Sequence, residues 1–165
     1  MNSTEQRPEG AFKNRRKSRE LALQTLYACE VGSGGGDDWR QMLNSIADSS
    51  ALSPDIVKYA SELVDAVYEN IAKLDQMIQE KAANWDIKRM AAIDRNVLRL
   101  SITELLFFPA TPVKVVIDEA VELAKMFGTD DSGKFVNGII DSINKKLKGQ
   151  SGNSGKEGLQ HGKTP

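Results

Sequence analysis

Apolar residues recur at intervals of three and four along most of the chain, and this spacing constrains the fold more than any other feature of the sequence. An α-helix places residues three and four apart on one face, so the pattern is typical of amphipathic helices. No segment alternates apolar and polar residues between turn signals, and no internal repeat is evident, so a sheet is not expected. The longest stripe consists of Ile56, Ala60, Leu63, Val67, Ile71, Leu74 and Ile78.

Capping and helix-breaking residues divide this pattern into an all-α bundle of about six to seven helices. Asp38 and Ser53 are suited to cap helices, and Pro54 fits the first helical position. The segment Pro109–Pro112 should separate two helices, and Gly128 should end one in a left-handed conformation. We expect helices over about 14–31, 38–48, 54–78, 87–108, 113–127 and 131–147.

These segments predict one helical domain made of two packed sub-bundles joined near Trp85. The segment 87–108 carries apolar residues on two stripes, which implies burial on several sides and a central position. The polar start and the Gly/Ser/Lys-rich end of the chain have the composition of disordered segments. The expected units are a flexible arm at 1–12, a domain at 13–148 with sub-bundles at about 13–83 and 84–148, and a disordered tail at 149–165.

Composition argues against several classes of function. Cys29 is the single cysteine and His161 the single histidine of 165 residues, and His161 lies in the expected tail. A disulfide framework, a multi-cysteine zinc site and histidine-based catalysis are therefore not expected, and we predict a non-enzymatic protein without a cofactor or metal. Apolar runs are too short to span a membrane and the start does not resemble a signal peptide, so we expect a cytoplasmic protein.

Basic residues are concentrated at the start of the chain. The first 19 residues hold six basic and two acidic side chains, a local charge of +4, whereas the whole chain carries −1. Guanidinium groups bind phosphates and stack on unpaired bases, and positive charge at a helix start opposes the helix dipole, which favours a polyanionic partner. The run alone leaves open RNA, DNA, an acidic protein or a solvated helix start. The run consists of Arg15, Arg16, Lys17 and Arg19, and the other two basic residues, Arg7 and Lys13, precede it.

Two other features could belong to a nucleic-acid surface. Tyr27 follows the basic run on the same expected helix, where its ring could either stack on a base or pack in the core. The segment 130–135, DDSGKF, places carboxylates, a lysine and an aromatic ring at a helix start, where free N–H groups can meet a phosphate. It lacks the glycine spacing and the preceding strand of a P-loop.

Four segments resemble the NusB family: RRKSRELALQTLYACE at 15–30, IDRNVLRLSITELL at 93–106, TPVKVVIDEAVELAKMFG at 111–128 and DDSGKFVNGIIDSI at 130–143. The similarity covers most of residues 13–147. It implies an all-α protein of two perpendicular three-helix sub-bundles that binds single-stranded boxA leader RNA together with NusE, a small-subunit ribosomal protein. It also implies a place in the RNA polymerase antitermination complex that reads through terminators in ribosomal RNA operons.

The resemblance further implies roles for individual residues. For the whole chain, the alternatives to an RNA-binding antitermination factor are a helical protein-interaction adaptor and an accessory domain of an rRNA-modifying system. The free protein could also be a homodimer that hides the basic surface. The charges that match the partner-facing surface could equally be exposed flanks of a buried helix. The RNA-binding positions are Arg15, Arg16, Lys17, Arg19, Tyr27, Asp131, Lys134 and Phe135, and the NusE-facing positions are Asp94, Arg95, Arg99 and Glu119.

Overall fold

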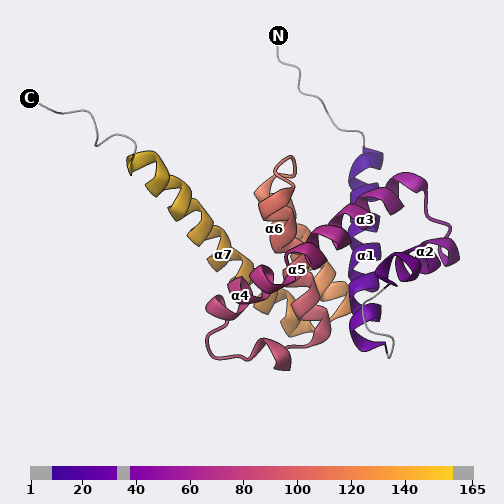
Figure 1. The fold of residues 1–165 in the computed structure, drawn as a ribbon, viewed down its shortest axis with the longest axis horizontal. Helices are drawn as coiled ribbons and strands as arrows, with labels where there is room; N and C mark the ends of the chain where they lie inside the picture. The colour runs from indigo at the N-terminus through magenta and orange to yellow at the C-terminus, as the bar shows by residue number, and fades with distance from the viewer. Residues whose placement is uncertain (1–8, 33–37, 158–165) are drawn as a thin grey trace, which may run out of the picture.

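The computed structural model describes residues 9–32 and 38–157, and within them every regular element is a helix. This confirms the all-α fold (Figure 1). The elements in chain order are α1 (Glu9–Val31), α2 (Trp39–Ser49), α3 (Pro54–Glu69), α4 (Ile71–Lys81), the 3₁₀ turn η2 (Ile87–Arg89), α5 (Ala92–Phe107), α6 (Val113–Phe127) and α7 (Asp130–Glu157).

Helices α1, α2 and α3 form the N-terminal group. Helix α1 packs against both α2 and α3, and its buried residues include Leu21, Leu23 and Leu26. The backbone N–H of Gln41 donates to the Asp38 carboxylate at 3.1 Å, so Asp38 caps α2 as its position suggested. Figure 1 shows α3 crossing alongside α1, which places the predicted basic segment next to α3.

The prediction of one continuous helix over 54–78 is wrong, because the chain breaks at Asn70 between α3 and α4. The Asn70 side chain donates to the carbonyl of Ala66 at 2.8 Å, within the last turn of α3. The break redirects α4 onto α5 and α7, where Leu74 and Ile78 are fully buried. We therefore group α4 with the C-terminal helices, with the change of group at Asn70 rather than near residue 83.

Helix α5 lies at the centre of the molecule, as its two apolar stripes predicted. It packs against α1, α3, α4, α6 and α7, and Val97, Leu98, Leu100 and Ile102 are completely buried. Because α5 contacts helices of both groups, it fixes the relative position of α1 and α6. These two helices carry Arg16 and Glu119, respectively.

Gly128 ends α6, but not in the left-handed conformation that we expected, because its φ is −104°. The reason for glycine is close packing. An added Cβ would lie 2.5 Å from the Ser132 hydroxyl oxygen and 2.7 Å from the carbonyl oxygen of Ala124. The tight turn lets α7 pack directly on α6.

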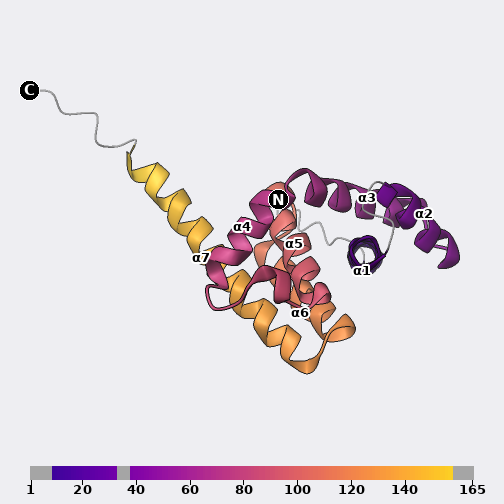
Figure 2. The ribbon, with the colours of Figure 1, turned by 60° about the horizontal axis from the view of Figure 1, so that its bottom comes forward.

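Two helices are longer than the sequence indicated. Helix α1 begins at Glu9, inside the expected arm, and α7 continues to Glu157, inside the expected tail. The last turns of α7 project away from the other helices in both views (Figures 1 and 2). The remainder of both expected segments, 1–8 and 158–165, lies outside the described residues. Within the described ranges, no helix combines the length and apolar character needed to cross a membrane.

Candidate nucleic-acid interface

The basic run lies inside α1 rather than at its start. Arg15 comes six residues after Glu9, so the run begins in the second turn of the helix. The effect of the helix dipole falls off within the first turn. The expected conflict between these charges and the dipole is therefore not present, and the basic run must be assessed by what each side chain contacts.

Arg19 is buried in an ion pair with Glu104 on α5. Its Nε and Nη2 atoms donate to the two carboxylate oxygens at 2.5 and 2.9 Å, and the side chains are 4% and 2% exposed. Burial opposes the charge on Arg19, but the hydrogen bonds and charge of Glu104 outweigh it and raise the pKa of the guanidinium. Arg19 has no surface to offer a phosphate in this structure, so we remove it from the predicted RNA-binding set and assign it to the core.

Arg16 connects α1 to α6 through Glu119. Its Nε and Nη2 atoms donate to the Glu119 carboxylate at 3.0 and 2.8 Å. Arg16 remains 47% exposed, whereas Glu119 is 17% exposed. The hydrogen bond and the charge of Glu119 raise the pKa of Arg16. The pair brings a predicted RNA-binding residue into contact with a predicted partner-binding residue more than a hundred positions away.

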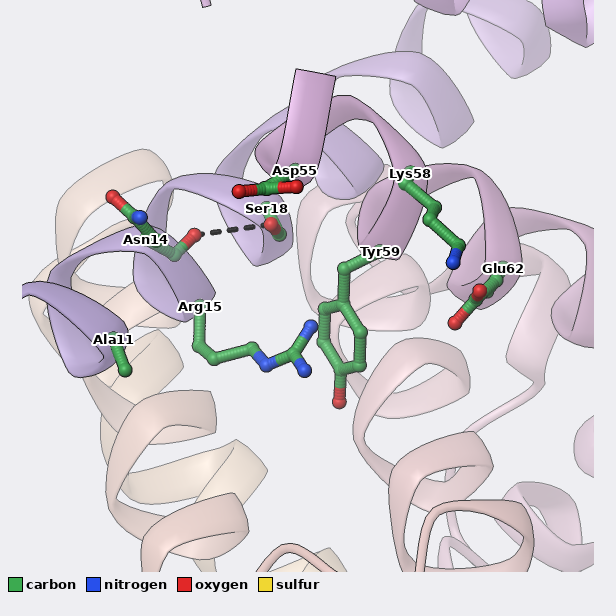
Figure 3. A pocket seen from close by; sticks show the side chains of 8 residues that line it. All are labelled: Ala11, Asn14, Arg15, Ser18, Asp55, Lys58, Tyr59 and Glu62. Carbon is green, nitrogen blue, oxygen red and sulfur yellow. Dashed lines mark hydrogen bonds between the residues drawn. The ribbon is translucent and has the colours of Figure 1, made fainter. Parts of the chain in front are cut away.

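Arg15 lies over the ring of Tyr59 of α3, with its guanidinium carbon 3.5 Å from the ring centre (Figure 3). Two adjoining cavities of about 370 and 540 Å³ share Arg15 and Tyr59 as lining residues. Lys17 is also exposed on α1. Tyr59 was not among the sequence candidates, because an aromatic residue on an amphipathic helix gives no sign of whether it supports a neighbouring cation.

Tyr27 and the start of α7 offer further exposed groups. The Tyr27 ring is 39% exposed and follows Arg16 by 11 residues, about 16 Å along the same side of the helix. At the start of α7, Asp131 and Lys134 are exposed, whereas Phe135 is half-buried against the hydrophobic core.

The predicted partner-facing arginines are used inside the molecule. Arg95 donates to the Glu30 carboxylate of α1 and to the carbonyls of Ile87 and Met90, and Arg99 donates to Asp75 of α4 at 2.7 and 2.8 Å. Both guanidinium side chains are 12% exposed.

These contacts favour the alternative in which Arg95 and Arg99 flank and brace a buried helix. Asp94 differs from them, because its buried Oδ1 has no hydrogen-bond partner among the described residues. Asp94 therefore stays a predicted partner-binding residue, and Glu119 stays one as well, with its carboxylate paired to Arg16.

Taken together, the geometry defines an all-α protein with a cationic helix surface at the junction of two helical groups. Exposed basic side chains and a cleft lined by arginine and tyrosine lie on α1 and α3. In residues 9–32 and 38–157, no cluster of three or more histidine, cysteine or carboxylate side chains could hold a metal ion. The surface is suited to binding an anionic polymer.

Comparison with known proteins identifies the family. The NusB family model matches residues 16–145. Transcription antitermination protein NusB of Geotalea daltonii is 44% identical over 139 residues, covering 81% of this chain and 96% of that protein. The chain therefore belongs to the NusB family.

Solved structures agree with this assignment. NusB of T. maritima is 38% identical with a TM-score of 0.73, and the match covers 79% of this chain and 90% of that one. A second structure contains antitermination factors NusB and NusE in complex with double-stranded RNA. Its matched chain is 27% identical with a TM-score of 0.73, and the match covers 81% of this chain and 98% of that one.

Proposed function

We propose that the chain is a cytoplasmic, non-enzymatic transcription antitermination factor that binds single-stranded boxA-type leader RNA together with NusE. In this role it helps the RNA polymerase antitermination complex read through terminators in ribosomal RNA operons. The observation that carries the proposal is that Arg16 and Lys17 are both exposed on α1. One of the similar solved structures contains NusB and NusE in complex with double-stranded RNA.

Three structural features support RNA as the ligand. Arg16 and Lys17 expose their charges on one stretch of α1, and an exposed cationic helix attracts a phosphate backbone. The exposed ring of Tyr27 lies on the same face of α1 as Arg16 and can contribute stacking, and the exposed Lys134 can contribute a further phosphate contact. Phe135 contributes less ring surface than we expected, because it is half-buried.

The test measures affinity for boxA-type RNA and for a scrambled RNA of equal length, each with and without NusE. We expect tighter binding of the boxA-type RNA, and a further gain when NusE is present. Lys17→Ala should lower the slope of log affinity against log salt by about one unit, because one phosphate contact is lost. Lys145→Ala is the matched control, since Lys145 is exposed on α7 and pairs with Asp141.

The outcomes separate this function from the alternatives. Equal affinity for both RNAs, together with an unchanged salt slope in Lys17→Ala, would favour a protein-interaction adaptor whose basic helix serves an acidic partner. Light scattering over a range of concentrations tests the homodimer. If dimerisation competes with RNA, the affinity for RNA should fall as protein concentration rises.

A further inference from the structure

The cleft between α1 and α3 has a rigid floor. The Tyr59 ring is only 6% exposed, its hydroxyl donates to Glu104 at 3.3 Å, and it meets the Phe108 ring edge-on with centres 5.6 Å apart. Arg15 lies over this fixed ring with its guanidinium carbon 3.5 Å from the ring centre. The ring that supports the guanidinium is therefore fixed before any ligand arrives.

The outer face of Arg15 is open to solvent. Arg15 is exposed, and it lines both adjoining cavities, of about 370 and 540 Å³. Figure 3 shows the side chain crossing from α1 to the Tyr59 ring on α3. A planar ligand can therefore stack on the guanidinium without displacing it from the tyrosine.

Charge in the cleft favours a neutral planar group over a phosphate. Arg15 and Lys58 are balanced by the carboxylates of Asp55 and Glu62, which line the same cavity. Carboxylates repel phosphate oxygens but accept hydrogen bonds from the exocyclic amines of bases. The neighbouring Arg16, one residue further along α1, is placed to hold the backbone of the same strand.

We propose that this cleft is a subsite for one unpaired nucleobase of the bound RNA, which stacks on the Arg15 guanidinium while Tyr59 supports the opposite face. Arg15 is then a base-binding residue, whereas Arg16 and Lys17 hold phosphates. The proposal rests on the RNA binding proposed above and adds the ligand group that this cleft takes. The apolar part of the larger cavity, formed by Phe107 and Pro109, encloses the edge of the base.

The experiment replaces each nucleotide of a labelled boxA-type RNA in turn by an abasic nucleotide, with NusE present, and measures affinity. For the wild-type chain, one position should lose about 5- to 100-fold in affinity because a stacked base is lost there. In Arg15→Lys the charge is kept but the planar stack is lost, so the penalty at that position should fall to about two-fold or less. The penalties at other positions should be unchanged.

Two variants serve as controls. Arg16→Lys makes the same chemical change next to Arg15, at a residue that contacts Glu119 rather than a ring, and should keep the full abasic penalty. Tyr59→Phe keeps the supporting ring and should also keep the full abasic penalty. Thermal melting verifies that this variant is folded. Loss of the penalty in Arg16→Lys would overturn the assignment to Arg15.

Other results also decide the question. A uniform loss of affinity in Arg15→Lys, with the same abasic profile, would make Arg15 a phosphate contact and overturn the subsite. If Arg15→Lys binds NusE more weakly in the absence of RNA and keeps the abasic profile of the wild type, a protein side chain fills the cleft. If the wild-type chain binds RNA but loses the same affinity at every abasic position, the base subsite is rejected and the proposed function stands. If the wild-type chain does not bind RNA, both the subsite and the proposed function are rejected.

Discussion

Arg19→Ala should destabilise the fold strongly and leave RNA binding nearly unchanged. The Glu104 carboxylate is 2% exposed. After the substitution it keeps one of its side-chain hydrogen bonds, the one from the Tyr59 hydroxyl at 3.3 Å. Removing one partner of a buried ion pair costs about 3–5 kcal/mol. A melting temperature falls by about 2–4 °C per kcal/mol in a domain of this size, so we expect a decrease of about 6–20 °C.

Circular dichroism during thermal and urea unfolding measures this effect. RNA affinity is then compared at a temperature at which Arg19→Ala is fully folded, where it should lie within about two-fold of the wild type. Lys17→Ala is the converse control, because Lys17 is exposed and its loss should change stability by no more than about 0.5 kcal/mol. Arg19→Met combined with Glu104→Leu should recover much of the stability, since neither charge is then left buried alone.

The opposite pattern would contradict a structural role for Arg19. If Arg19→Ala melts like the wild type and loses most of its RNA affinity, Arg19 leaves Glu104 to contact phosphate in the complex. A double variant less stable than either single variant would show that the pair is not the source of the effect.

Two further predictions concern Glu119 and Tyr68. Without NusE, Glu119→Gln should raise RNA affinity by about 1.5- to 5-fold, because Arg16 no longer has to leave a carboxylate. Glu122→Gln removes the same charge one turn away and should not raise the affinity. Equal gains in both variants would show a simple charge effect. Burial, with Cys29 nearby, raises the pKa of Tyr68 from 10.0 to about 12, so the neutral form is favoured in the folded chain. The contribution of the neutral Tyr68 to the free energy of unfolding is complete below pH 10 and is lost as the pH rises toward about 12. In urea unfolding, Tyr68→Phe should therefore lose less stability over this pH range than the wild type. An unchanged loss of stability would assign the effect to other groups.

Hydrophobic spacing predicted the helices well because it reports which face of a segment is buried. It did not predict the break at Asn70, since Leu74 and Ile78 continue the stripe after the chain has changed direction. Neither glycine nor proline marks the position. The stripe shows that both segments bury one face, but not that α3 buries it against α1 and α4 against α5 and α7.

The sequence located the basic helix but did not distinguish the roles of its arginines. Arg15, Arg19, Ala22 and Leu26 follow one another at intervals of four, three and four, so Arg19 continues a stripe whose later members are buried. That spacing was a usable signal that Arg19 points inward. The identity of its partner was not predictable, because Glu104 lies 85 residues away on a helix whose contacts with α1 depend on the tertiary fold.

The basic helix also holds the two groups of helices together. Arg19 is anchored to α5, Arg16 to α6 and Arg15 to α3, so the same helix forms the proposed RNA surface and the junction of the molecule. A phosphate that binds the Arg16 guanidinium competes with Glu119 for it, and a partner that binds Glu119 competes with Arg16. Because such coupling is reciprocal, NusE bound at Glu119 would raise RNA affinity by the same factor as RNA raises the affinity for NusE.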